Sequence, residues 1–80
     1  MLAKSISLAT VSPGKEVRVV SVIAGRGLAQ RLADMGLLPG TVLKVVNRHG
    51  AGPTLVEFRG ARLALGYGVS QKIMVEKTGG

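Results

Sequence analysis

Apolar and charged positions alternate along several short stretches of this chain. Between residues 16 and 22, Val17 and Val19 alternate with charged neighbours before the apolar positions become continuous. The same period of two recurs between residues 55 and 59, where Val56 and Phe58 share one face. This period is typical of a strand with one face against a core. Further strands are predicted at residues 41–48, 61–65 and 72–76.

Turn chemistry separates these strands. Leu38-Pro39-Gly40-Thr41 predicts a type II turn, because proline presets the first central residue and glycine accepts the positive φ of the second. The glycine-rich residues 49–53 predict a hairpin loop, and Gly60 predicts the next reversal after a strand that includes Arg59. Residues 66–70 are predicted to form a turn.

One segment follows a helical period instead. Leu28, Leu32 and Met35 are spaced i, i+4 and i+7, which places them on one face of a two-turn helix over residues 28–35. Gly36 is expected to end that helix with a positive φ, and Met35 is expected in the core. Five short strands with one inserted helix predict a mainly β fold, a small SH3-like barrel.

Composition limits the possible classes of protein. The 80 residues carry 11 Lys and Arg against 4 Asp and Glu, a formal charge of +7. This length fits one domain over residues 1–80, with short flexible ends expected near 1–4 and 77–80. No cysteine is present, which excludes disulfides and thiolate metal sites, and no apolar run approaches the length of a membrane span. We therefore expect a cytoplasmic protein without membrane insertion.

The positive charge favours an acidic partner. Nucleic acid is disfavoured among such partners, because Phe58 and Tyr67 are the only aromatic residues and the basic residues are dispersed along the chain. Proteins that bind single strands usually offer several aromatic stacking surfaces.

The inventory of reactive side chains argues against an enzyme. The single histidine, His49, falls in the predicted glycine-rich loop, and the carboxylates are spread over different elements. Such a set gives neither a catalytic constellation nor a good divalent-metal site. We therefore predict no enzyme activity, no catalytic residue and no cofactor. His49 is the one candidate metal ligand, and we favour a polar loop residue there.

Two features stand above this background as candidate partner contacts. Gly25-Arg26-Gly27 precedes the predicted helix, where backbone N–H groups and a guanidinium can hold an anion; a solvated Arg26 beside flexible glycines is the alternative. After the helix, Leu37 and Leu38 can hardly both be buried in so small a domain. One of them is expected to pack the turn against the helix, and the other to contact a partner.

The central run Arg31-Leu32-x-x-Met35-Gly36-Leu37-x-Pro39-Gly40, with Gly52-Pro53 and the closing Ile73-x-Val75, resembles the FeoA family. The resemblance extends from Leu8 to Val75. It implies an SH3-like barrel and an accessory role in bacterial ferrous iron uptake and iron homeostasis.

The partner implied by the resemblance is the FeoB membrane transporter, contacted at its cytosolic GTP-binding domain. The predicted contact residues are Arg26, Arg31, Leu37 and Leu38, which would place the protein at the cytoplasmic side of the inner membrane. Two alternatives remain open: a basic module that binds nucleic acid, and a regulatory domain related to iron-dependent repressors. A homo-oligomer is also open, because strand edges of small barrels can pair. Transition-metal binding belongs to the family as a whole; we expect this chain alone to bind Fe²⁺ weakly.

Overall fold

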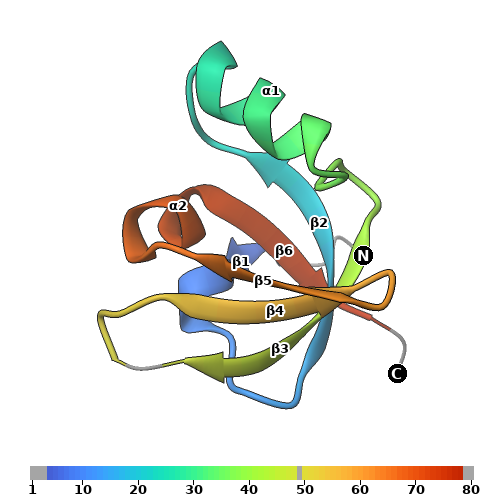
Figure 1. Cartoon of the computed structure of the whole chain (residues 1–80), viewed down its shortest axis with the longest axis vertical. Helices are drawn as coiled ribbons and strands as arrows, with labels where there is room; N and C mark the ends of the chain where they lie inside the picture. The colour runs from blue at the N-terminus through green and yellow to red at the C-terminus, as the bar shows by residue number, and fades with distance from the viewer. Residues whose placement is uncertain (1–3, 49, 79–80) are drawn as a thin grey trace.

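The strands of this chain form one curved antiparallel sheet (Figure 1). The structure is a computed structural model and describes residues 4–48 and 50–78. In these residues the strand order is β1-β6-β2-β3-β4-β5. The strands are β1 (Ile6–Ser7), β2 (Glu16–Val22), β3 (Val42–Arg48), β4 (Thr54–Phe58), β5 (Ala61–Leu65) and β6 (Ile73–Lys77). The predicted mainly β, SH3-like fold is confirmed, with β1 as a strand that the sequence pattern did not reveal.

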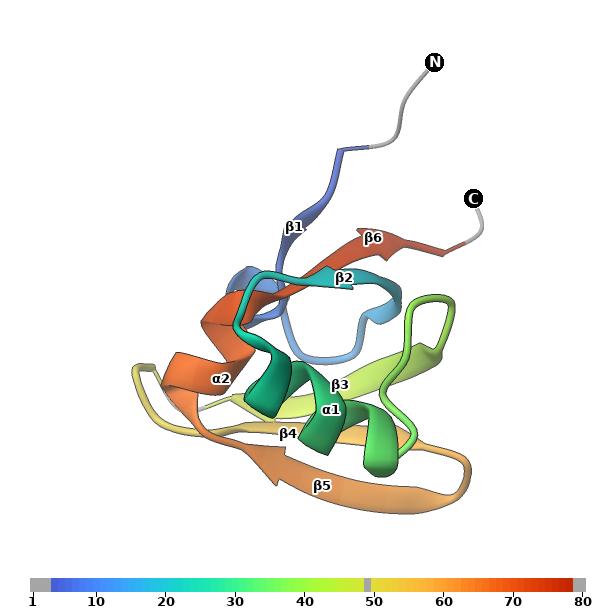
Figure 2. The ribbon, with the colours of Figure 1, turned by 90° about the horizontal axis from the view of Figure 1, so that it is seen from above.

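The described residues also form three short helices, of which α1 and α2 are labelled in Figure 2: the 3₁₀ helix η1 (Leu8–Thr10), α1 (Arg26–Asp34) and α2 (Tyr67–Lys72). The turn predicted at residues 66–70 is wrong, because the residues after Gly66 belong to α2, for which Gly66 is the N-cap. Ser70 is buried in α2, and its hydroxyl lies 3.0 Å from the carbonyl oxygen of Gly66. The helix is stabilised there by a polar contact that hydrophobic periodicity does not register.

The inner face of the sheet carries the core. Val17 and Val19 of β2 and Val56 of β4 are buried, as their alternation predicted. The other core residues include Leu8, Leu32, Leu37, Leu43, Val45, Leu65, Ile73 and Val75. Core residues therefore come from η1, from α1 and the segment after it, and from strands β2 to β6.

The β4–β5 hairpin corrects one prediction. Arg59 does not extend the strand but lies in the two-residue turn that joins Phe58 to Ala61. Its φ is +54° and that of Gly60 is +76°, so both central residues are left-handed. Such turns match the twist of the flanking strands, which explains why a non-glycine residue is held in this conformation.

The end of α1 determines which apolar residues enter the core. The Leu37 amide donates to the Leu32 carbonyl at 2.8 Å, and the Gly36 amide donates to the Ala33 carbonyl at 2.9 Å. With Gly36 at a φ of +94°, these bonds define a Schellman motif, which brings Leu37 against Leu32. Met35 caps the helix and is 44% exposed. Its predicted core role is wrong because Leu37 takes that place.

The outer face of the sheet carries alternating charges. A row of directly opposed residues crosses β2, β3, β4 and β5: Glu16, Lys44, Glu57 and Arg62. Nε of Arg62 lies 3.1 Å from Oε2 of Glu57, and Nη1 of Arg18 lies 3.3 Å from Oε1 of Glu76 on β6. Opposite charges in directly opposed positions stabilise a sheet. On this face Glu57 and Glu76 form ion pairs, and Glu16 lies opposite Lys44.

Candidate docking groove beside helix α1

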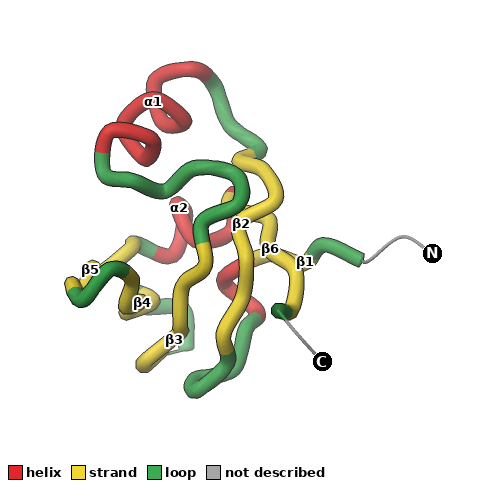
Figure 3. Tube along the Cα trace, turned by 90° about the vertical axis from the view of Figure 1, so that its right-hand side faces the viewer, coloured by secondary structure: helices red, strands yellow, loops and turns green. Residues whose placement is uncertain are grey.

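Helix α1 lies at one end of the curved sheet, between the end of β2 and the start of β3 (Figures 1 and 3). Its inward side holds Leu32, which is buried, and Leu28, which is half-buried against the core. Gln30 and Asp34 are exposed, and Nε2 of Gln30 donates to Oδ1 of Asp34 at 2.8 Å. The helix is thus anchored to the core along one stripe and leaves its flank open.

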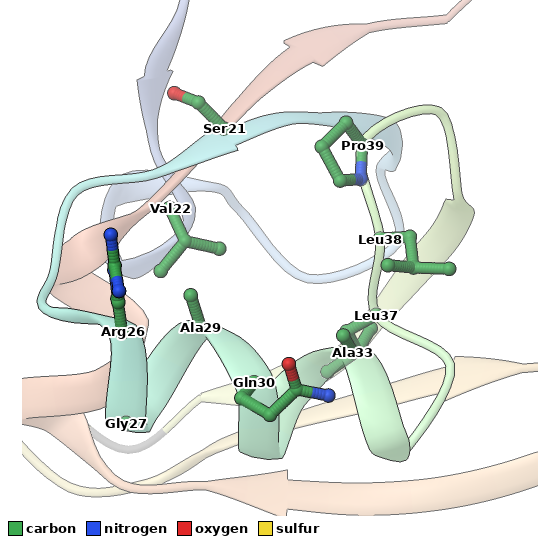
Figure 4. A pocket seen from close by; sticks show the side chains of 10 residues that line it. All are labelled: Ser21, Val22, Arg26, Gly27, Ala29, Gln30, Ala33, Leu37, Leu38 and Pro39. Carbon is green, nitrogen blue, oxygen red and sulfur yellow. The ribbon is translucent and has the colours of Figure 1, made fainter.

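An open groove of about 700 Å³ runs along that flank (Figure 4). Its walls come from the end of β2, from α1 and from the segment that follows α1. We call it the α1 groove. It is lined by Ser21, Val22, Arg26, Gly27, Ala29, Gln30, Ala33, Leu37, Leu38 and Pro39.

Small residues on α1 leave the space for the groove. Ala29 and Ala33 are spaced i, i+4, so they lie on one side of the helix and face the space opposite Leu38 and Pro39 in Figure 4. Longer side chains at these two positions would occupy the gap between the helix and the opposite wall. The groove is therefore a consequence of the small side chains of Ala29 and Ala33.

Hydrogen bonds hold the opposite wall in place. The Gly40 amide donates to the Val19 carbonyl at 2.7 Å, and the Val19 amide donates to the Thr41 carbonyl at 2.8 Å. The Thr41 hydroxyl donates to the Gly36 carbonyl at 3.0 Å. The turn at residues 38–41 is thereby attached both to β2 and to the end of α1, so this wall is formed before any ligand arrives.

Exposed apolar side chains occur on the segments that form or adjoin the walls of the groove. Ile23, in the segment that joins β2 to α1, is 65% exposed, and Leu38 is 47% exposed. Val20 and Val42 are exposed on the adjoining ends of β2 and β3. We call these four residues the apolar rim. Exposed apolar residues on segments that form or adjoin a concave surface are typical of a protein interaction site.

The charge near the groove is positive. Arg26 lines the groove at the N-terminal end of α1, whose first turn contains no acidic residue. Within residues 4–48 and 50–78 the ion pairs are Arg18–Glu76 and Arg62–Glu57, so Arg26 has no carboxylate partner there. The positive end of the helix dipole adds to the charge of this guanidinium.

Comparison with known proteins places this chain in a family. A family model described as FeoA domain matches residues 6–77. The chain is also 44% identical over 69 residues to a protein of Methanocaldococcus jannaschii that bears the name Fe(2+) transport protein A, covering 86% of this chain and 83% of that protein. The chain belongs to the FeoA domain family. The resemblance found in the sequence is confirmed.

Solved structures agree with this FeoA assignment. The crystal structure of an iron uptake regulatory protein, FeoA, is 32% identical with a TM-score of 0.83, covering 94% of this chain and 99% of that one. A manganese-dependent transcriptional repressor in complex with manganese has a TM-score of 0.88 at 23% identity, covering 98% of this chain and 39% of the repressor. The second likeness concerns the fold alone.

In this FeoA domain the predicted contact residues separate into three environments. Arg26 and Leu38 both line the α1 groove. Leu37 also lines the groove but is only 2% exposed, so it offers a partner little surface, and its role as a partner contact stays a prediction. The expectation that one of the two leucines is buried is confirmed. Arg31 lines a smaller cavity of about 190 Å³ on the other flank of α1, next to β5 and α2. Of the candidate residues at the groove, Arg26 and Leu38 are therefore the ones exposed to a partner.

The groove itself was missed by the sequence analysis, because its walls come from segments that are separate in the chain. One signal was available in the i, i+4 spacing of Ala29 and Ala33, which indicates a helix flank with little side-chain volume. The apolar rim gave a second signal in Ile23, a large aliphatic residue between the predicted strand and helix.

The part of the chain that the structure describes holds neither a cluster of metal ligands nor a helix that could span a membrane. No group of three or more His, Asp or Glu side chains is arranged there to hold a metal ion. His49, the candidate metal ligand, lies outside the described residues. No described helix is long and apolar enough to cross a membrane.

Proposed function

We propose that this FeoA-domain protein is a non-enzymatic accessory protein of ferrous iron uptake, which binds the cytosolic GTP-binding domain of a FeoB-type transporter. The observation that supports this is the α1 groove with its apolar rim. The relative from M. jannaschii that is named for Fe(2+) transport supplies the physiological context. In this proposal Fe²⁺ is the cargo of the transporter, the protein needs no cofactor, and it acts at the cytoplasmic side of the membrane.

The physical case for a protein partner comes from burial. The side chains of Ile23 and Leu38 are about half or more exposed although both are aliphatic. Covering such side chains with a partner releases about 25 cal/mol per Å² of apolar area. The α1 groove adds a concave surface into which a partner side chain can be inserted, and such buried central contacts contribute most of the binding energy in protein interfaces.

Nucleic acid is a less suitable partner for this surface. On the outer face of the sheet each carboxylate of the charge row lies opposite a basic residue, so that face is not a continuous basic surface. Phe58 is half-buried, which leaves Tyr67 as the exposed aromatic side chain. A strand of nucleic acid would find neither a basic track nor a series of stacking rings.

An NMR titration tests the proposal. Isotope-labelled protein is titrated at physiological salt with the GTP-binding domain of the cognate transporter, loaded either with GDP or with a non-hydrolysable GTP analogue. We expect chemical-shift changes at α1 and at residues 20–23 and 37–42. A mixed-sequence oligonucleotide serves as the control ligand.

Two matched variants make the titration specific. Leu38→Asp places a charge on the apolar rim and should abolish binding while the protein stays folded, since Leu38 is outside the core. Ala51→Asp adds the same charge in the exposed β3–β4 loop and should bind like the wild type. Absence of any response to the GTP-binding domain, with broad shifts upon addition of the oligonucleotide, would refute the proposed function.

A further inference from the structure

We infer that the α1 groove takes an aliphatic side chain from an acidic segment of the partner protein, and that a carboxylate of the same segment pairs with Arg26. This inference rests on the proposed function only in so far as the natural partner is a protein. It goes further by naming the chemistry of the segment that is bound and the flank of α1 that binds it.

The shape and lining of the groove favour binding of an aliphatic side chain. Its volume of about 700 Å³ falls within the range of roughly 300–1,000 Å³ that is usual for ligand clefts. Methyl groups of Ala29, Ala33 and Val22 line it together with Leu38 and Pro39. A polar side chain placed among these groups would lose hydrogen bonds to water without gaining new ones.

The charge distribution around the groove favours binding of an acidic segment. Glu16, Glu57 and Glu76 lie on the outer face of the sheet, where they are opposed by basic residues or paired with them. Asp34 is the single acid on α1, and it lies at the C-terminal end of the helix, away from Arg26. The N-terminal end of the groove therefore combines a guanidinium that pairs with no carboxylate of the described residues and the positive end of a helix whose N-cap residue, Gly25, provides no side-chain cap.

These two requirements meet at one place. Arg26 projects at the edge of an apolar surface, so a carboxylate that binds it is partly removed from water. Charge-assisted hydrogen bonds are stronger in such a partly dehydrated environment than in water. A segment that carried a basic residue at the same position would be repelled. The groove thus selects both for an aliphatic anchor and for the sign of the neighbouring charge.

The two flanks of α1 are predicted to act differently. Arg31 lines the smaller cavity next to β5, on the other side of the helix from the groove. Reversing its charge should therefore affect binding less than reversing that of Arg26. This distinction separates the inference from a general attraction between a basic protein and an acidic partner.

Synthetic peptides test the chemistry directly. Labelled protein is titrated at physiological salt, up to millimolar concentration, with acetyl-EELLEELLEE-amide, with its glutamine analogue QQLLQQLLQQ and with its lysine analogue KKLLKKLLKK. We expect the acidic peptide to shift the resonances of Ala29, Ala33 and Leu38, and to bind about tenfold or more tightly than the glutamine analogue, which corresponds to about 1.4 kcal/mol. The lysine analogue should not bind.

Four variants locate the site. Ala29→Leu fills the groove and preserves helix propensity, and Ala51→Leu makes the same change in the β3–β4 loop. Arg26→Glu reverses the charge in the first turn of α1, where an acid favours the helix, so loss of binding cannot be ascribed to unfolding. Lys15→Glu makes the same change in net charge at the opposite end of β2.

Each result bears on the inference. Loss of about tenfold or more in affinity with Ala29→Leu and with Arg26→Glu, against less than about threefold with the two controls, would support it. Equal binding of the acidic and lysine peptides, equal effects of Arg26→Glu and Lys15→Glu, or no peptide binding would overturn it.

The same variants are then titrated with the GTP-binding domain, so that the two proposals can fail separately. Binding of the acidic peptide at the groove without binding of the GTP-binding domain would refute the proposed function and leave the inference standing. Equal binding of the domain to wild type, Ala29→Leu and Arg26→Glu would refute the inference and leave the proposed function standing.

Discussion

Two adjacent leucines should respond in opposite ways to the same substitution. Leu37 is 2% exposed and packs in the core as part of the Schellman motif, whereas Leu38 is 47% exposed on the edge of the α1 groove. We therefore expect Leu37→Ala to destabilise the protein strongly and Leu38→Ala to leave its stability nearly unchanged. The pair is matched in residue type, in size and in position along the chain.

The size of the effect follows from the burial of Leu37. Truncation to alanine removes three carbon atoms, which at about 0.8 kcal/mol for each buried CH₂ gives about 2.4 kcal/mol. The cavity that remains adds to this, and buried Leu→Ala substitutions cost about 2–5 kcal/mol in all. Because Leu37 also lines the open groove, part of the new space joins the groove, so we expect about 3 kcal/mol. Leu38→Ala should lower the free energy of unfolding by less than about 1 kcal/mol.

Urea unfolding followed by far-ultraviolet circular dichroism measures both values, since the chain contains no tryptophan. A domain of this length has a free energy of unfolding of about 4–12 kcal/mol, so the Leu37 variant should remain measurable. Its melting temperature should fall by about 12–24 °C. A loss below about 1 kcal/mol for Leu37→Ala, or equal losses for both variants, would refute the assignment of Leu37 to the core.

Four further substitutions test other features. Gly36→Ala should lower the free energy of unfolding by about 1–2 kcal/mol, because the φ of Gly36 is +94° and the new Cβ would lie 3.4 Å from Nη1 of Arg59. Gly27→Ala inside α1 should instead raise the free energy of unfolding by about 0.5–1 kcal/mol. Thermal unfolding of both variants compares the two effects. Thr54→Val should raise the free energy of unfolding by up to about 1 kcal/mol in urea, since Oγ1 of Thr54 is buried without a hydrogen-bond partner among the described residues. Glu57→Lys places a cation between two basic neighbours of the charge row and should lower stability by less than about 1 kcal/mol, an effect that added salt should reduce.

Features whose cause lies within a few residues could be predicted from the sequence. The type II turn is present, with Gly40 at a φ of +95° and the Thr41 amide 2.9 Å from the Leu38 carbonyl. The helix predicted at residues 28–35 is present as α1 and ends before Gly36, as expected. In each case the residue type itself sets the backbone conformation.

Features that depend on distant partners could not be predicted in this way. Strand β1 has only two residues, too few for a period, and it exists because Ile6 pairs with Val75. Met35 fits the helical stripe, but the geometry after Gly36 gives its place in the core to Leu37. The α1 groove needs three segments in their final positions. Of the candidate site, the sequence therefore indicated Arg26 and Leu38 but not the surface that they share.

The position of β6 has a consequence for how the chain folds. In the sheet β6 lies between β1 and β2, although it follows both of them and every other strand in the sequence. The hydrogen bond from the Ser7 hydroxyl to the Ser70 carbonyl likewise joins residues that are 63 positions apart. Contacts over such separations form late, because the intervening chain must be closed into a loop first. During synthesis β1 therefore cannot pair until β6 has been made, whereas β2 to β5 can pair with one another before that.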